Sequence, residues 1–182
     1  DKINNSKLRQ FYNIGNVGSG FGFDLVSCQF AMHYFFKNIK TLDNFLNNVS
    51  KSLKSGGKFI GTCFDGKKVF EKLKYSEIIG TPKLWTIKKL YDNTSLLDND
   101  SSLGYEIEVF NESIGATIKE YLVNFDYLIE KAKIYDLELS ELKNFSEFFG
   151  EIDKKDYGDA KKMSEELQEY SFLNNAFVFE KK

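Results

Sequence analysis

The feature that most constrains the fold is an alternation of apolar strand patterns with helical patterns. An apolar run at residues 23–28 is followed by a helical pattern at about 41–53, a second strand pattern at 58–63 and a helical pattern at 67–74. A β-α-β-α order favours a parallel sheet with right-handed crossovers. We therefore expect an α/β fold whose first two strands are parallel.

The first of these strands ends in an unusually polar stretch. Gln29, His33 and Tyr34 follow it directly, and His33 is the single histidine of the 182 residues. Open α/β sheets bind their ligands at the carboxyl ends of the strands. A lone histidine on an apolar face is more often structural, so the residues alone leave a structural and a site role both open.

Composition bounds the possible functions. A length of 182 residues fits one domain, and a formal net charge of −2 argues against broad, sequence-independent nucleic-acid binding, although a local basic groove stays compatible with it. Cys28 and Cys63 lie in strand patterns and are interpreted as small buried hydrophobes rather than a disulfide framework. One histidine and two distant cysteines do not form a metal-ligand pattern.

The middle and end of the chain predict further elements. Alternating residues at 84–91 and 104–110 favour a β-hairpin, which we expect inserted over the sheet within a region of about 84–117. Apolar spacing predicts a helix at 119–135. We also expect a short strand at 137–139, a helical turn at 145–149, a helix at 163–170 and a closing strand at 173–179, with residues 153–160 as a charged loop.

The first residues and the termini carry less information. Residues 1–22 form a polar, glycine-rich connection, and 23–182 the domain. The glycine run within them precedes a strand, whereas a nucleotide-binding glycine loop must follow one and open a helix. No run of 18 apolar residues and no signal-peptide pattern is present, so we expect a chain that is neither membrane-spanning nor secreted. A start at Asp1 rather than Met indicates a fragment of something longer.

Glu120 is the second candidate for chemistry. It lies near the start of the predicted 119–135 helix, where a carboxylate ordinarily stabilises the helix dipole. The alternative is a binding role, because a carboxylate can accept two adjacent N–H bonds from the edge of a guanine.

Several segments together resemble the catalytic domain of mRNA cap (guanine-N7) methyltransferases. The resemblance runs from about residue 23 to the end, and its most specific element is a strand that ends in Gln-Phe-x-x-His-Tyr. Asp65-Gly66-Lys67 is similar to the version found in capping enzymes of large DNA viruses. The matching segments are Gln29-Phe30-Ala31-Met32-His33-Tyr34, Gly56-Gly57-Lys58-Phe59-Ile60-Gly61-Thr62, Glu120-Tyr121-Leu122-Val123 and Phe177-Val178-Phe179-Glu180-Lys181.

This resemblance implies a class I S-adenosylmethionine-dependent methyltransferase fold, which is Rossmann-like, and S-adenosyl-L-methionine as cofactor. It implies that Gln29 and Tyr34 contact the cofactor, and that Phe30, His33, Tyr34 and Glu120 line the pocket for the cap guanine, with Glu120 and His33 as catalytic residues. Asn174 occupies the position where many members place a tyrosine facing the cap. The implied partner is 5′-capped RNA, with guanylyltransferase and triphosphatase domains of the same polypeptide and a stimulatory subunit as further candidates. The location would be cytoplasmic for a viral protein and nuclear for a cellular one.

The chain also departs from the family. The Asp-x-Gly-x-Gly-x-Gly motif, the acidic residue for the cofactor ribose and an upstream lysine are absent, and by the resemblance they would precede residue 1. Two other hypotheses therefore stay open. One is a non-catalytic, methyltransferase-like accessory subunit of a capping enzyme. The other is a different S-adenosylmethionine-dependent methyltransferase that acts on RNA or a small molecule.

Overall fold

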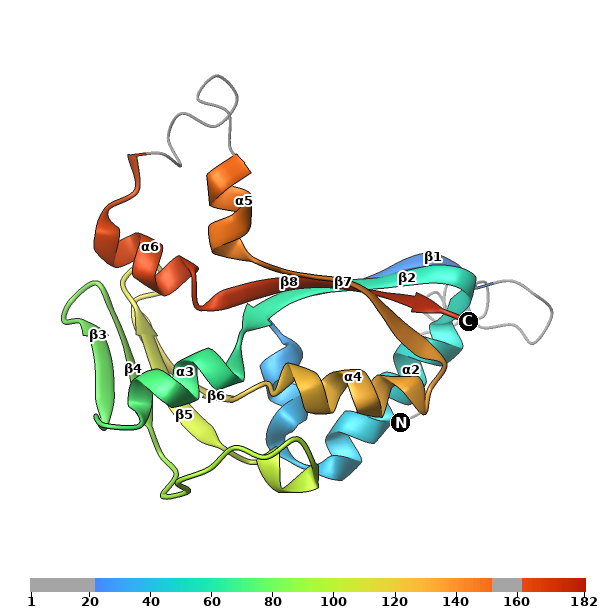
Figure 1. Cartoon of the computed structure of the whole chain (residues 1–182), viewed down its shortest axis with the longest axis horizontal. Coiled ribbons are helices and arrows are strands. Elements are labelled where there is room, and N and C mark those ends of the chain that lie inside the picture. Colours follow the sequence, from blue (N-terminus) through green and yellow to red (C-terminus); the bar gives the residue numbers. More distant parts are fainter. Residues whose placement is uncertain (1–21, 152–161) are drawn as a thin grey trace.

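The computed structural model describes residues 22–151 and 162–182, which form two four-stranded sheets with helices around them (Figure 1). The first sheet has the order β1 (Phe23–Gln29), β2 (Leu53–Phe64), β8 (Asn174–Lys181) and β7 (Leu137–Asn144). β1 and β2 are parallel, as predicted, whereas β8 runs antiparallel to both of its neighbours. The sheet is therefore mixed.

The crossover between β1 and β2 contains the 3₁₀ helix η1 (Met32–Lys37) and helix α2 (Ile39–Ser52). The side chain of Asn38 accepts a hydrogen bond from the Thr41 amide, and the Thr41 hydroxyl is paired with the Asn38 backbone amide. This reciprocal capping box fixes the start of α2. The predicted helix at 41–53 is thus present, and its start lies two residues earlier because Asn38 provides the cap.

The second sheet is antiparallel and has the order β3 (Ile78–Thr81), β4 (Trp85–Lys89), β5 (Glu106–Asn111) and β6 (Ala116–Tyr121). It follows helix α3 (Gly66–Leu73), and the 3₁₀ helix η2 (Asp100–Ser102) lies in the β4–β5 connection. β4 and β5 are the two strands of the predicted hairpin. β3 and β6 extend that hairpin into a sheet, which the sequence analysis did not predict.

The prediction of one helix over 119–135 is wrong. Residues 116–121 form β6, and the helix, α4 (Phe125–Lys133), begins only after Asn124. The side-chain oxygen of Asn124 accepts from the amides of Asp126 and Tyr127, so this residue caps the helix. Glu120 pairs with Ile107 of β5 in the sheet ladder. Its interpretation as a helix-dipole residue is therefore also wrong.

Two short helices complete the described chain. α5 (Phe145–Glu151) projects from the end of β7, and α6 (Glu165–Ser171) leads into β8 (Figure 1). They correspond to the predicted turn at 145–149 and the predicted helix at 163–170. The indole N–H of Trp85 donates to the Glu166 carbonyl at 2.8 Å, which attaches α6 to the second sheet. The predicted connection at 1–22, apart from residue 22, and most of the predicted loop at 153–160 lie outside the described residues.

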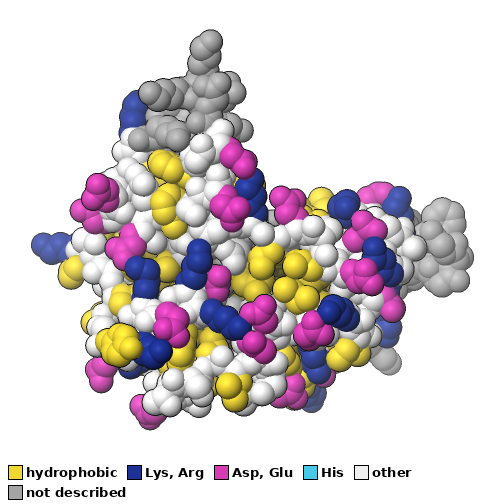
Figure 2. Space-filling view, in the orientation of Figure 1, with side chains coloured by type: hydrophobic (Ala, Val, Ile, Leu, Met, Phe, Trp, Pro, Cys, Tyr) yellow, Lys and Arg dark blue, Asp and Glu magenta, His cyan; other side chains and the backbone are white. Residues whose placement is uncertain are grey.

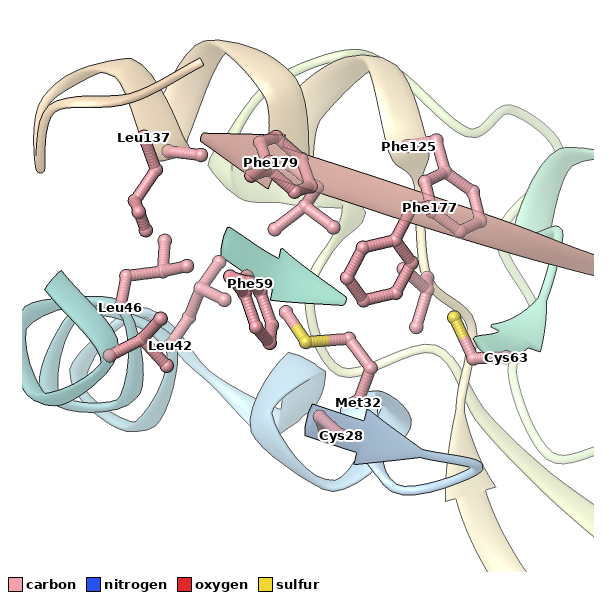
Figure 3. Close-up of a cluster of buried hydrophobic side chains, with 14 of the residues drawn as sticks. Cys28, Met32, Leu42, Leu46, Phe59, Cys63, Phe125, Leu137, Phe177 and Phe179 are labelled. Carbon is pink, nitrogen blue, oxygen red and sulfur yellow. The ribbon is translucent and has the colours of Figure 1, made fainter. Parts of the chain in front are cut away.

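The main core lies between the first sheet and the helices α2 and α4. Figure 3 shows Phe59, Phe177 and Phe179 of the sheet facing residues such as Leu42 and Leu46 of α2. Burial of such side chains contributes about 1.5–3 kcal/mol each. Cys28 and Cys63 are free and buried in the same cluster, as predicted. None of the helices in the described part of the chain has the length and apolar character that crossing a bilayer would demand.

Candidate functional site

The candidate site begins where β1 ends. The Phe30 amide donates to the Thr62 carbonyl of β2 at 2.8 Å, and Phe30 adopts a φ of +49°. A left-handed conformation is uncommon for a bulky residue and is found where the surrounding structure over-determines it. The turn sets the Phe30 side chain outside the core, where 56% of the residue is exposed. The chain then enters η1, which carries His33 and Tyr34.

His33 and Glu120 meet although they lie far apart in the sequence. Nδ1 of His33, on η1, lies 3.3 Å from Oε2 of Glu120, on β6. The two residues are only 6% and 9% exposed. The other imidazole nitrogen, Nε2 of His33, is buried and has no hydrogen-bond partner among the described residues. Because an unsatisfied buried polar atom is costly, this nitrogen is a candidate ligand contact.

Burial sets the electrostatics of this pair. It lowers the pKa of His33 to about 4 and raises the pKa of Glu120 to about 7, because each charged form is poorly solvated there. Near neutral pH the imidazole is therefore uncharged and the carboxyl group is close to its midpoint. The two groups lie 3.3 Å apart without carrying opposite charges near neutral pH, so the contact is not a salt bridge.

Gln29 lies at the carboxyl end of β1 with its side chain exposed. Its Oε1 accepts from the Thr62 hydroxyl at 2.8 Å, and its Nε2 donates to the Ser27 hydroxyl at 2.9 Å. These two bonds orient the amide at the open edge of the sheet. Thr62 belongs to one of the matching segments, but its bond to Gln29 was not predicted.

Exposed aromatic rings border the pair. The Tyr34 ring lies 4.2 Å from the His33 ring, between centroids, at an interplanar angle of 66°, and the residue is 48% exposed. The Phe30 ring makes an edge contact with Phe145 of α5 at 6.2 Å. The structure thus brings one region together from the carboxyl end of β1, the following helix η1 and strand β6 of the second sheet, and this region contains Gln29, Phe30, His33, Tyr34 and Glu120.

Asn174 differs from the other predicted site residues. It is buried, and its side-chain amide donates to the carbonyls of Ser171, at 3.1 Å, and Tyr170, at 3.4 Å. These bonds hold the end of α6 to the start of β8. The recorded side-chain bonds of Asn174 are thus to α6 and not to the His33–Glu120 pair.

Sequence reasoning missed Tyr170. Its ring packs against Phe64 and Trp85, at centroid distances of 5.5 and 5.2 Å. Burial raises the pKa of Tyr170, a hydrogen bond with the Asn111 side chain opposes this rise, and the negative charge of Glu120 adds to it. A tyrosine within an acidic helical stretch has no periodic or spacing signal that could have identified it.

Comparison with known proteins decides the family. Residues 4–177 match the model of the mRNA (guanine-N(7))-methyltransferase domain. The chain belongs to this family. It is 38% identical over 136 residues to mRNA cap guanine-N(7) methyltransferase 1 of Arabidopsis thaliana, covering 73% of this chain and 36% of that protein. It is 31% identical over 158 residues to a protein of Acanthamoeba polyphaga mimivirus described as a probable mRNA-capping enzyme, covering 80% of this chain and 13% of that protein.

The chain therefore spans about a third or less of these two relatives. Among solved structures, a candidate S-adenosylmethionine-dependent methyltransferase from Listeria monocytogenes matches with a TM-score of 0.50 at 15% identity, covering 94% of this chain and 66% of that chain. This likeness concerns the fold alone. The expected α/β methyltransferase fold is confirmed.

Proposed function

We propose that this cap methyltransferase-family protein transfers the methyl group of S-adenosyl-L-methionine to N7 of the 5′ cap guanosine of RNA. The observation that carries the proposal is the buried contact between His33 and Glu120, 3.3 Å apart. Within the described part of the chain, Nε2 of His33 has no hydrogen-bond partner, which supports recognition of a polar base edge by this pair. Its position beside the carboxyl end of β1 agrees with the usual ligand edge of α/β sheets.

In this proposal each residue acts on a stated part of the ligands. Glu120 accepts from N1–H and N2–H of the guanine, and His33 faces O6. The exposed rings of Phe30 and Tyr34 border the base, and Asn174 holds the α6 wall of the same pocket through its bonds to Tyr170 and Ser171.

The open edge of the first sheet fits one side of a nucleoside cofactor. Gln29 presents an oriented amide there, and Tyr34 lies beside it. S-adenosyl-L-methionine, when bound, supplies an electrophilic methyl group on a sulfonium. The described residues would bind and orient the two ligands at this edge.

Methyl transfer to guanine N7 requires the side chains mainly to position the two ligands. Guanine N7 carries an available lone pair, so the methyl transfer needs no general base. Positioning of reacting groups can supply effective molarities of up to about 10⁸ M. As N7 takes the methyl group the guanine becomes cationic, and its N1–H and N2–H become stronger donors. Their bonds to Glu120 therefore stabilise the transition state more than the ground state.

Replacing Glu120 tests this role. Glu120→Ala removes the acceptor, so we expect turnover on capped RNA to fall by at least about 100-fold, the usual scale for one such group. Glu108→Gln is the matched control because Glu108 pairs with Lys119, on the opposite face of the same sheet from Glu120. Circular dichroism checks that both variants are folded. Wild-type turnover in a folded Glu120→Ala protein would contradict the assignment.

The role of His33 is tested by the preference of the enzyme for capped guanosine over other nucleotides, in addition to the rate of methyl transfer. His33→Ala removes the contact with O6, so capped guanosine should lose its advantage over other nucleotides. Competition by uncapped triphosphate RNA measures this, and we expect it to inhibit the variant more strongly than the wild type. Unchanged competition would remove His33 from the pocket.

We further propose that the chain belongs to a capping enzyme of the large-DNA-virus type, with guanylyltransferase and triphosphatase domains on the same polypeptide. The similarity to the mimivirus protein and the Asp65-Gly66-Lys67 sequence support this. Asp65 caps α3 by accepting from the amides of Lys67 and Lys68, and its other oxygen accepts from Asn175 of β8. A cytoplasmic location and a stimulatory subunit are parts of the same proposal.

A further inference from the structure

The His33–Glu120 contact restricts how the imidazole can hydrogen-bond to a ligand. His33 uses Nδ1 toward Glu120 and leaves Nε2 for anything that enters the site. In a neutral imidazole one nitrogen donates and the other accepts. If Nδ1–H donates to an ionised Glu120, Nε2 is an acceptor. If a protonated Glu120 donates to Nδ1, Nε2 carries the hydrogen and becomes a donor.

Guanine discriminates between these two forms. Its edge presents the O6 acceptor next to the N1–H donor. The pair complements this edge when Nε2–H of His33 donates to O6 while the free oxygen of Glu120, Oε1, accepts from N1–H and from the adjacent N2–H. With one proton fewer, the Nε2 lone pair would face O6, and two acceptors would be held against each other in a buried site.

We propose that guanine binds only to the form in which Oε2 of Glu120 carries a proton and donates it to Nδ1 of His33 while Nε2 carries the imidazole hydrogen, so that binding takes up a proton above neutral pH. This inference rests on the proposed function and specifies the state of the same site. Guanine is then selected by the protonation state of the His33–Glu120 pair as well as by the shape of the pocket.

The neighbouring titratable groups do not supply this proton. Among the described residues, the Tyr34 ring of η1 contacts His33, and Cys63 of β2 and Tyr170 of α6 interact electrostatically with Glu120. Burial raises the pKa of Cys63 and of Tyr170, so both stay neutral between pH 6 and 8. The pKa of Glu120, about 7, makes its carboxyl group the one of the pair that titrates in this range.

Calorimetry in buffers of different ionisation enthalpy measures the proton directly. The full-length protein is titrated with GpppG, which lacks the N7 methyl group, at pH 6, 7 and 8. We expect proton uptake near zero at pH 6, about one half at pH 7 and close to one at pH 8, with an affinity about tenfold weaker at pH 8 than at pH 6. Proton release, or an affinity that is constant or rises with pH, would overturn the inference.

Glu120→Gln provides a second test because its amide imitates the protonated carboxyl group. The amide N–H can donate to Nδ1 and the amide oxygen can accept from N1–H, so we expect GpppG affinity without pH dependence and without proton uptake. Glu108→Gln should keep the wild-type profile. A Glu120→Gln variant that retains the wild-type pH dependence would place the proton elsewhere. Absence of GpppG binding by the wild type at every pH would overturn the proposed function, and this inference with it.

Discussion

At the scale of single residues, the two buried ionisable side chains of the site, Glu120 and His33, lower the free energy of unfolding at the pH values where they would be charged in water. Glu120 has a folded-state pKa of about 7 against an ordinary value of 4.5, so the folded state binds its proton more tightly than the unfolded state does. The cost of burying the charge therefore appears as pH rises from 4.5 through 7. His33, with its pKa lowered to about 4, costs stability as pH falls from 6.5 toward 4.

This leads to a prediction about a stabilising substitution. Glu120→Gln removes the buried charge, so its free energy of unfolding should exceed that of the wild type at pH 8 by up to about 3 kcal/mol. At pH 5 the difference should be small because Glu120 is then protonated in the folded protein. Urea unfolding at the two pH values measures it. A variant that is less stable than the wild type at pH 8 would contradict this account.

At the scale of elements, the close approach of β8 to β2 depends on one glycine. A Cβ added at Gly61 would lie 2.4 Å from the Phe177 ring and 2.4 Å from the Cys28 carbonyl. Both neighbours belong to the packed core of Figure 3 and cannot move cheaply. The close spacing of the strands at this point therefore requires a residue without a side chain.

Gly61→Ala should consequently destabilise the protein by about 1–3 kcal/mol or more, measured by thermal or urea unfolding. Gly150→Ala is the matched control, because nothing lies within 4 Å of its added Cβ and it sits in α5, where alanine is the better helix former. Equal stability of the two variants would show that the contact at Gly61 relaxes freely.

The secondary structure around Glu120 shows which elements the sequence could predict and which it could not. The β1, α2, β2 and α3 segments were predictable because their apolar periodicity and caps agree. The stretch from Ile118 to Tyr135 mixes a strand and a helix with similar apolar content, and only the cap at Asn124 separates them. The strand assignment of Glu120 depends on pairing with β5, which is a tertiary interaction.

At the scale of the whole molecule, positive and negative residues nearly balance, and neither sign dominates the face seen in Figure 2. Figure 2 shows lysine and acidic side chains interspersed over the visible face, in keeping with the formal net charge of −2. Recognition of capped RNA would then depend on the pocket more than on a broad field. The resemblance in sequence predicted residues for that pocket, which stays a prediction. The His33–Glu120 distance, and the absence of a hydrogen-bond partner for Nε2 among the described residues, could be seen only in the fold.

The central claim is that this chain belongs to an enzyme that methylates the cap guanine at N7. The most direct measurement incubates the full-length protein with labelled S-adenosyl-L-methionine and RNA that carries an unmethylated guanosine cap, and then identifies the released cap nucleoside by mass spectrometry. We predict label in 7-methylguanosine alone, dependent on Glu120. Label at another base or at a ribose, or no transfer to capped RNA by a folded protein that binds the cofactor, would contradict the account.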